Sequence, residues 1–234
     1  IIYLPDCYQP NDDKRQISPR IPERKEQGLP TDGFVYCSFN KPYKITPAVF
    51  SCWMSILRQT DNSVLWLQSS DPNVIENLGR EAVKANVDRS RIIFAGRTPS
   101  TEDHLARYQL ADLFLDTYPY TAHTTANDAL WAGLPVLGLS GRTFSARVST
   151  SLLTALGLPD LVMPNLDCYV EKAVALAKRP QELAGYKDRL AIGKTNASLY
   201  KPAQIARYLE QGLHQAHATY LSGDRPEHII VAGN

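Results

Sequence analysis

The residues with the clearest chemical potential lie together where a short apolar run meets a predicted helix. His123, Thr124 and Thr125 stand between the apolar residues 113–115 and the apolar side chains of that helix. Thr125 and Asp128 have the spacing of a capping box, which predicts a helix that begins at or near Thr125. A helix N-terminus offers free N–H groups and a partial positive charge, and both suit a phosphate group. Two hydroxyl groups and an imidazole add further hydrogen-bonding groups at the same place.

Strands and helices alternate through most of the chain and must position these residues. Apolar runs rich in β-branched and aromatic residues predict strands over residues 34–39, 64–68, 92–95, 113–116, 136–139 and 161–162. Helical patterns are expected over residues 47–58, 73–86, 101–109, 125–132, 145–156, 166–178, 180–192 and 202–221. Short strands that alternate with helices form βαβ units. The expected fold class is therefore α/β, a doubly wound parallel sheet with a helical C-terminal tail.

Polar clusters follow several of the predicted strands. In open α/β sheets, ligands bind beyond the C-terminal ends of the strands. The clusters that end at this edge cover residues 40–44, 96–100, 117–125 and 141–143. Four loops that converge on one edge favour a ligand site more strongly than any single motif does.

Composition and charge describe an ordinary globular chain. Hydrophobic residues make up 44% and charged residues 21% of 234 residues, and the net charge is +1. This charge gives no general electrostatic argument for nucleic acid as a partner, and no apolar run approaches the ~20 residues of a membrane span. The four cysteines lack CxxC spacing and nearby metal-like histidines, so we expect reduced thiols in a cytoplasmic protein.

The N-terminal part of the chain differs from the rest in pattern. Its first five residues lack Met and a basic segment before an apolar core, so they do not look like a signal peptide but like the middle of a longer chain. Residues 5–32 are rich in proline and charge and carry no strong periodicity, which predicts a linker or a wrapped surface segment.

An ordered set of motifs resembles the O-GlcNAc transferase family, which transfers N-acetylglucosamine from UDP-GlcNAc to Ser and Thr of proteins. The set centres on residues 123–128 and 130–135, which read HTTAND and LWAGLP. Further matches, in the family's order, lie at residues 34–40, 43–45, 63–67, 91–94, 109–112 and 145–148, and residues 223–228 resemble the family's C-terminus. The resemblance implies the Rossmann-like, donor-binding C-terminal half of a two-domain GT-B glycosyltransferase that acts with inversion.

The resemblance gives five residues roles at the diphosphate and the sugar. It implies that Lys44 is catalytic and neutralises the charge that grows on the leaving phosphate. Thr124 and Thr125 would donate hydroxyl and backbone N–H groups to the phosphates, and His123 would donate to phosphate or sugar. Lys41 stands where the family often has Gln, and would be a second cation facing phosphate. The alternatives are solvated lysines, capping threonines and a structural histidine.

The resemblance places the nucleoside against four further residues. Asp128 would accept hydrogen bonds from the ribose hydroxyls, although a capping carboxylate is an alternative. His104 would stack on uracil with Arg107 near the base, or both would lie on an exposed polar helix face. Thr98 and the neighbouring backbone would read the edge of the uracil. The family commonly has a lysine in this loop, for which Arg97 is the one candidate here.

No cofactor is expected. The sequence has no DxD-like pair that would call for a metal-bound sugar diphosphate, and members of the family need no metal. GxSxG, HExxH, P-loop and GxGxxG motifs are also missing. The expected partners are UDP-GlcNAc or UDP, a protein acceptor, and an upstream catalytic half with tetratricopeptide repeats in the same chain, but neither nucleic acid nor a membrane.

Three alternative functions stay open at this point. They are a related cytosolic transferase that moves a hexose onto Asn, a nucleotide-sugar epimerase, and a UDP-binding module without catalysis. The epimerase would need acidic catalytic residues that the sequence does not reveal. The expected division of the chain is the same for all of these functions. Residues 1–32 form a linker or the end of a preceding domain, residues 33–200 form a UDP-sugar-binding domain, and residues 201–234 form a C-terminal helix and tail.

Overall fold

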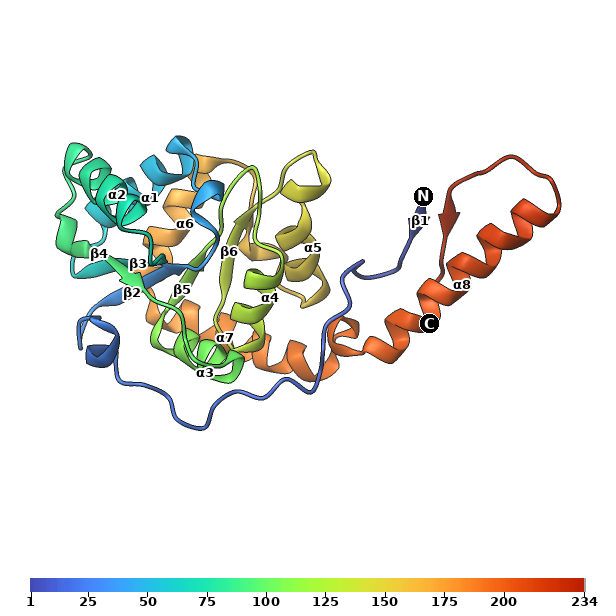
Figure 1. The fold of residues 1–234 in the computed structure, drawn as a ribbon, viewed down its shortest axis with the longest axis horizontal. Coiled ribbons are helices and arrows are strands. Elements are labelled where there is room, and N and C mark those ends of the chain that lie inside the picture. The colour runs from blue at the N-terminus through green and yellow to red at the C-terminus, as the bar shows by residue number, and fades with distance from the viewer. Residues whose placement is uncertain (234) are drawn as a thin grey trace.

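A six-stranded, all-parallel sheet forms the centre of the computed structural model, which describes residues 1–233 (Figure 1). Its strands, in spatial order, are β4 (Ile92–Ala95), β3 (Ser63–Gln68), β2 (Phe34–Ser38), β5 (Leu113–Leu115), β6 (Val136–Leu139) and β7 (Val162–Met163). The chain runs outward from β2 to β4, returns to β5 beside β2, and then runs outward to β7. The strand order therefore reverses between β2 and β5, where sheets of this kind bind their ligands.

Helices cover both faces of this sheet. They are α1 (Pro47–Gln59), α2 (Pro72–Lys84), α3 (Thr101–Arg107), α4 (Thr124–Trp131), α5 (Val148–Ala155), α6 (Leu166–Lys178) and α7 (Pro180–Asn196), whereas α8 (Pro202–Leu221) extends away from the sheet (Figure 1). The Tyr36 hydroxyl donates to the Ala173 carbonyl of α6 at 3.0 Å. Phe39 packs on Tyr108, just after α3, with ring centroids 5.0 Å apart. Residues 36 and 39 point to opposite faces because side chains alternate along a strand. The predicted doubly wound α/β fold is confirmed.

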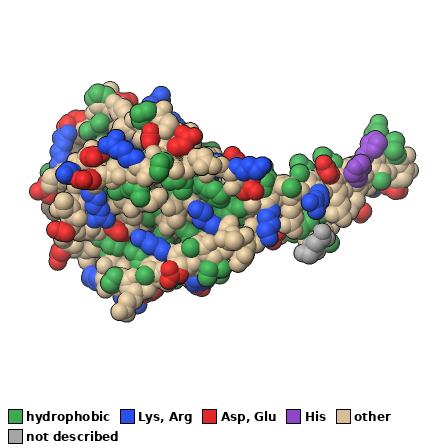
Figure 2. All heavy atoms as spheres, turned by 90° about the horizontal axis from the view of Figure 1, so that it is seen from below, with side chains coloured by type: hydrophobic (Ala, Val, Ile, Leu, Met, Phe, Trp, Pro, Cys, Tyr) green, Lys and Arg blue, Asp and Glu red, His purple; other side chains and the backbone are tan. Residues whose placement is uncertain are grey.

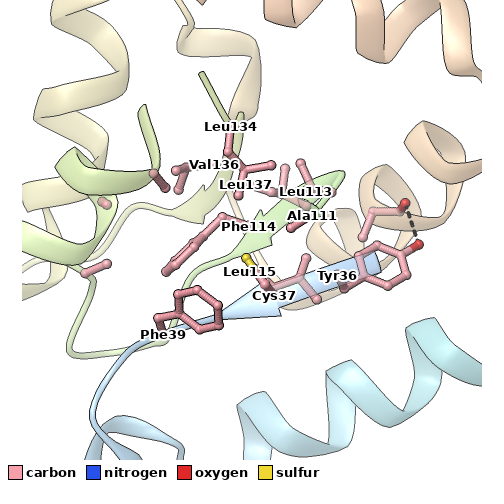
Figure 3. Close-up of a cluster of buried hydrophobic side chains, with 14 of the residues drawn as sticks. Tyr36, Cys37, Phe39, Ala111, Leu113, Phe114, Leu115, Leu134, Val136 and Leu137 are labelled. Atoms are coloured by element: carbon pink, nitrogen blue, oxygen red, sulfur yellow. Dashed lines mark hydrogen bonds between the residues drawn. The ribbon is translucent and has the colours of Figure 1, made fainter. Parts of the chain in front are cut away.

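The core lies between the sheet and its helices. Figure 3 shows Cys37, Phe39 and Phe114 packed together there with the aliphatic side chains of β5 and β6. Helix α1 shows how local sequence places apolar side chains in this core. Thr46 caps it by accepting the Val49 N–H at 3.3 Å, and a proline follows at the first helical position. Its apolar face is buried along the whole helix.

One expected helix is interrupted. Residues 145–156 were predicted to be continuous, but a 3₁₀ turn, Phe144–Ala146, precedes α5. The carbonyls that a longer helix would use accept other bonds: Ser145 from the Thr121 N–H at 3.0 Å, and Ala146 from the Gly141 N–H at 2.9 Å. The loops after β5 and β6 therefore donate to the carbonyls of this turn, so these carbonyls are not available for a longer helix.

The segment before β2 wraps over the surface of the domain (Figure 1). It holds one 3₁₀ turn, Arg24–Gln27, and is otherwise mostly irregular. Asn11 donates to the Leu199 carbonyl at 3.2 Å, and Arg24 pairs with Asp112 at 3.0 Å. These bonds hold the segment against opposite ends of the domain.

The two ends of the chain meet on a projecting arm (Figure 1). The sequence did not predict that β1 (Ile2–Tyr3) pairs with β8 (Ile229–Ile230) alongside α8, since two-residue strands carry no periodicity. Gly212 allows the close approach: a Cβ atom there would lie 2.5 Å from Ile2. The space-filling view shows histidines near the tip of the arm and mixed charges on the domain (Figure 2). Within residues 1–233, no helix is long and apolar enough to cross a membrane.

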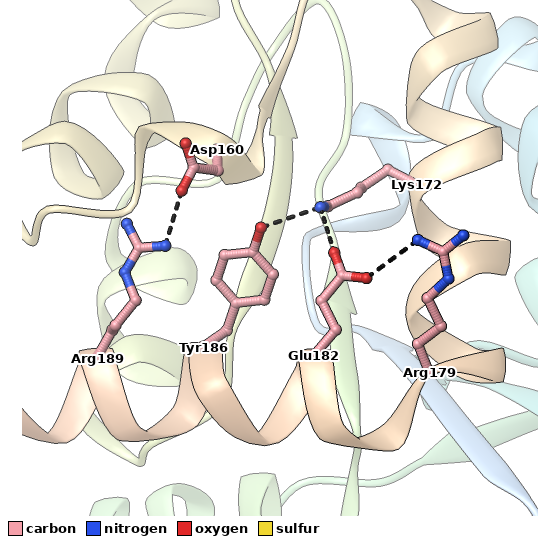
Figure 4. Close-up of polar contacts among 6 residues, drawn as sticks. All are labelled: Asp160, Lys172, Arg179, Glu182, Tyr186 and Arg189. Carbon is pink, nitrogen blue, oxygen red and sulfur yellow. Dashed lines mark hydrogen bonds and ion pairs between the residues drawn. The ribbon is translucent and has the colours of Figure 1, made fainter.

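Polar contacts fasten α7 to the elements before it (Figure 4). Lys172 of α6 donates to Glu182 at 2.7 Å and to the Tyr186 hydroxyl at 2.9 Å. Arg189 pairs with Asp160, just before β7, at 2.7 Å. The helical tail is thus anchored to the sheet domain before α8 leaves it.

Candidate functional site

The loops that follow β2 and β5 meet at the point where the strand order reverses. Asn40, the second residue after β2, is 2% exposed and joins them. Its Nδ2 donates to Thr117 Oγ1 at 3.0 Å and to Asp116 Oδ1 at 3.3 Å. Its Oδ1 accepts from the Thr125 hydroxyl at 2.6 Å. The predicted convergence of loops is present, and Asn40, which was not among the predicted contact residues, carries it.

Helix α4 begins at this junction without a side-chain cap. The helix starts at Thr124, and no side chain among residues 1–233 accepts from its first N–H groups. The predicted capping box is wrong: Thr125 lies in the first turn and bonds to Asn40, and Asp128 bonds to Arg15. The first N–H groups of a helix have no partner within it. They therefore stay available to an anion, together with the hydroxyl of the exposed Thr124.

Lys44 is seated beside the loop that leads into α4. Its Nζ donates to the Thr121 carbonyl at 2.9 Å and lies 3.9 Å from the centroid of the Tyr120 ring. The residue is 8% exposed, so the alternative of a solvated lysine is wrong. Burial lowers the pKa of the Lys44 ammonium, while the nearby Asp116 carboxylate opposes that shift. The cation is thus held in place next to the uncapped helix.

His123 immediately precedes α4 and lies among aromatic rings. Its ring centroid is 5.3 Å from that of Tyr120 and 6.2 Å from that of Phe144. Its Nε2 is buried and has no hydrogen-bond partner among residues 1–233. Burial, and then Lys44, lower the pKa of His123, against a backbone hydrogen bond with Ser145 that raises it. An unsatisfied ring nitrogen beside a free helix N-terminus can bond to a ligand.

Asp116 shapes the loop between β5 and α4 from inside. Its Oδ1 accepts the N–H groups of Thr117 and Ala122, each at 2.7 Å, and the side chain is fully buried. Burial raises the pKa of Asp116 to about 6, against the hydrogen bonds and Lys44, which lower it. The strand expected over residues 113–116 ends at this residue, for which the sequence predicts no role. A carboxylate directly after a buried strand was the available signal.

The predicted base-binding residues form a second group, after β4. Arg107 is 1% exposed and donates to the Gly96 carbonyl at 2.7 Å, so an exposed polar helix face is wrong for it. Its guanidinium also contacts His104 Nδ1 at 2.7 Å and lies 4.5 Å from the Phe39 ring centroid. Burial, and then Arg107, lower the pKa of His104 to about 4. Thr98 makes a hydrogen bond within its own loop.

An open hollow of about 410 Å³ lies beside the site, between the loops that follow β2, β3 and β4. Lys41 and Arg97 line it, and both are exposed. The structure therefore places Lys41 apart from the buried Lys44, on the side of the base-binding group. A second hollow of about 450 Å³, by Gly33 and Asp112, lies at the opposite ends of the strands and away from these residues.

Asp128 lies one turn into α4 and is paired with a residue from the N-terminal segment. Its Oδ1 accepts from the Arg15 guanidinium. Arg15 in turn is seated on Trp131: its carbonyl accepts the indole N–H at 3.2 Å, and its guanidinium lies 5.6 Å from the ring centroid. Burial raises the pKa of Asp128, whereas Arg15 lowers it. No periodic or motif signal could have identified Arg15.

Comparison with known proteins shows which family this chain is similar to. The model named "Glycosyl transferase family 41" matches residues 11–209. A UDP-N-acetylglucosamine--peptide N-acetylglucosaminyltransferase of Caenorhabditis elegans is 35% identical over 209 residues, which is 89% of this chain and 18% of that protein. The "Probable UDP-N-acetylglucosamine--peptide N-acetylglucosaminyltransferase SEC" of Arabidopsis thaliana is 32% identical over 100% of this chain and 24% of that protein. The chain thus spans about a quarter or less of these relatives.

Solved structures share the architecture. A mutant of the Thermobaculum terrenum O-GlcNAc transferase matches with a TM-score of 0.71 and 30% identity, over 80% of this chain and 36% of that one. The Anabaena protein HepE in complex with UDP and glucose matches with a TM-score of 0.62 and 14% identity, over 86% of this chain and 55% of that one. The second likeness concerns the fold alone. The roles of individual site residues stay predictions.

Proposed function

Because the chain belongs to glycosyl transferase family 41, we propose that it is the nucleotide-sugar-binding part of a protein O-GlcNAc transferase. Its family membership confirms the resemblance drawn from the ordered motifs. The proposed reaction is inverting transfer of N-acetylglucosamine from UDP-GlcNAc to Ser or Thr of a protein, as the names of its relatives support. The observation that carries the proposal is the uncapped N-terminus of α4 beside the buried Lys44 and the unpartnered His123 Nε2.

The diphosphate is assigned to the start of α4. Free N–H groups and the hydroxyl of Thr124 would donate to phosphate oxygens, and Lys44 would face them from the loop after β2. When the bond between sugar and diphosphate breaks, negative charge grows on the leaving phosphate. A fixed ammonium stabilises that developing charge more than it stabilises the bound donor, which is the requirement for raising the rate. His123 would bond to phosphate or sugar through its free Nε2, which donates when the single proton of the neutral ring is on that nitrogen.

The nucleoside is assigned to the group after β4 and to Asp128. The neutral imidazole of His104, held by Arg107, offers a face for stacking on uracil, and Thr98 lies in the loop that would read the edge of the base. Arg15 occupies one oxygen of Asp128, so the ribose hydroxyls would bond to the other, Oδ2. A carboxylate suits a ribose diol, as it does in dinucleotide sites.

No metal is part of this proposal. Lys44, with Lys41 and Arg97 at the neighbouring hollow, supplies positive charge that a metal would otherwise provide. Residues 1–233 contain no group of three or more His, Cys, Asp or Glu side chains arranged to hold a metal ion. The proposed donors to the diphosphate are nitrogen and hydroxyl groups.

The acceptor and the rest of the reacting centre are proposed to come from outside these residues. The relatives are four or more times longer than the matched part, so room exists for an upstream catalytic half and tetratricopeptide repeats. A cytoplasmic setting belongs to the same proposal, since Cys7, Cys37, Cys52 and Cys168 are free thiols.

Calorimetric titration of the chain with UDP, UDP-GlcNAc, UDP-glucose, ADP and GDP tests the proposal. We expect the uridine nucleotides to bind and the purine nucleotides to bind at least tenfold more weakly. A preference for UDP-glucose over UDP-GlcNAc would favour the hexosyltransferase alternative. Failure to bind any uridine nucleotide would contradict the proposed site.

A further inference from the structure

The side-chain amide of Asn40 has its two ends in different surroundings, and this fixes its orientation. One end faces Asp116 Oδ1 and Thr117 Oγ1. A carboxylate accepts hydrogen bonds, and the Thr117 hydroxyl has already given its single proton to the Tyr120 carbonyl at 2.7 Å. Both neighbours of that end are therefore acceptors. The amide nitrogen must lie there, and the amide oxygen must lie at the other end.

The orientation of Asn40 decides what the Thr125 hydroxyl can do. The amide oxygen only accepts, so the hydroxyl at 2.6 Å must be the donor. A hydroxyl carries one proton, and this one is directed into the protein. Only lone pairs of Thr125 Oγ1 are left to face a ligand. Phosphate oxygens are acceptors as well, so a hydrogen bond from this hydroxyl to phosphate is not available in this arrangement.

Thr124 is the contrasting neighbour. It is exposed, and no hydrogen bond of its hydroxyl is formed within residues 1–233. Its proton is free to point at a ligand in front of the helix. The two adjacent threonines therefore differ in the direction of their hydroxyl groups, although the sequence motif presents them as a pair.

We propose that Asn40 is a positioning residue of the nucleotide site: it commits the Thr125 hydroxyl to the protein and leaves the Thr124 hydroxyl, with the free N–H groups of α4, to bind the diphosphate. The inference rests on the proposed function, because it concerns the same ligand. Asn40 acts across the point of strand-order reversal, since it links the loop after β2 to α4. Asp116 is the fixed end of this chain of hydrogen bonds, held by two backbone N–H groups.

Two isosteric substitutions separate the threonines. Thr124→Val and Thr125→Val each replace a hydroxyl by a methyl group, and UDP affinity is measured by calorimetry on the 234-residue chain. We expect Thr124→Val to lower the affinity for UDP about tenfold or more, which is the usual loss for a hydrogen bond to a charged group. We expect Thr125→Val to lower it less than about threefold. Thr154→Val, at an exposed position on α5, serves as the control and should leave UDP affinity unchanged.

A charge substitution tests Asn40 itself. Asn40→Asp places a second carboxyl against Asp116, and both can be accommodated only when they share a proton. We expect the affinity of this variant for UDP-GlcNAc to rise at least tenfold between pH 8 and pH 5.5, with no such rise in the wild type. UDP-GlcNAc is the probe because its diphosphate has no group that titrates in this range. A merely structural role for Asn40 would not produce this pH profile.

The outcomes are separable. Equal losses from Thr124→Val and Thr125→Val, with unchanged melting temperatures, would overturn the assignment of hydroxyl directions and leave the proposed function intact. Wild-type protein that binds no UDP would overturn the proposed function, and the inference with it. If Asn40→Asp does not fold, the two valine variants still decide the proposal.

Discussion

The carboxylate of Asp128 on α4 pairs with the guanidinium of Arg15, which lies 113 positions earlier in the chain. The contact ties the wrapped N-terminal segment to the helix whose N-terminus forms the candidate phosphate site. The side chains of Arg15 and Asp128 are 17% and 12% exposed. A change in the N-terminal segment would therefore reach a side chain proposed to bind the ribose.

Replacing Asp128 by Asn should weaken the binding of UDP more than the binding of inorganic diphosphate, because the proposed contact is to the ribose. Loss of a charged hydrogen bond costs about 1.5–3 kcal/mol, so UDP affinity should fall about tenfold or more. Titrations of both ligands measure the difference. Arg15→Gln is the matched control for loss of the ion pair without loss of the carboxylate. Parallel losses of the two ligands on Asp128→Asn would argue against a ribose contact.

Asp116 should contribute a loss of stability as pH rises from about 4 to about 6, while His104, whose pKa is lowered to about 4, contributes a gain over the same range. Burial raises the pKa of Asp116 from 3.8 to about 6, so in this range Asp116 binds more protons in the folded state than in the unfolded state. Its contribution to the slope of unfolding free energy with pH is then negative, and amounts to about 3 kcal/mol at about 1.36 kcal/mol per unit. Urea denaturation at several pH values should show the contribution of Asp116 as the difference in slope between the wild type and Asp116→Asn, because both proteins contain His104. Identical slopes for both proteins would refute the assignment.

Lys44→Ala should reduce turnover more than donor binding when placed in the full-length enzyme. The charge that Lys44 faces is larger in the transition state than in the bound donor. Steady-state kinetics separates the two effects: we expect kcat to fall by a larger factor than KM rises. Lys41→Ala is the comparison variant, because Lys41 is a cation at the exposed hollow. It should mainly raise KM. A raised KM with intact kcat for Lys44→Ala would remove Lys44 from the catalytic role.

Removal of divalent metal should not affect nucleotide binding. The proposed donors to the diphosphate are the α4 N–H groups, the Thr124 hydroxyl and the Lys44 ammonium, none of which needs a bridging ion. Titration of UDP in excess EDTA should therefore give the same affinity as titration in Mg²⁺. A fall of tenfold or more in EDTA would show that a metal ion completes the site.

Residues 1–234 alone should bind UDP and transfer no sugar. The sheet and its loops account for a nucleotide, whereas residues 1–32 are mostly irregular and offer no second domain. Much of the rate of a two-substrate enzyme comes from holding both substrates together. The assay is transfer of labelled N-acetylglucosamine to a Ser/Thr peptide, with the full-length enzyme as positive control. Robust transfer by these residues alone would show that the division of labour is wrong.

Much of the fold was predictable because its signals are local. Strand β4 begins and ends where its apolar run does, and Thr46 followed by Pro47 marks the start of α1 through bonds within one turn. The order of strands and helices then limits the sheet to a parallel arrangement, which brings the polar loop ends to one edge. The prediction of one continuous helix over residues 145–156 was wrong, because the carbonyls of Ser145 and Ala146 accept hydrogen bonds from loops elsewhere in the chain.

The sequence by itself determined the order of elements, the parallel sheet and the edge at which the candidate site lies, since these follow from periodicity and short-range capping. Tertiary structure alone decided the state of each side chain at that edge. Arg107 is buried under its loop, Asp128 is paired with Arg15, and Thr125 is turned toward Asn40. The partners of these three side chains, which are Gly96, Arg15 and Asn40, are distant in sequence and are brought close only by the fold. Hydrogen-bond direction and burial depend on what surrounds a group in three dimensions, which no spacing along the chain specifies.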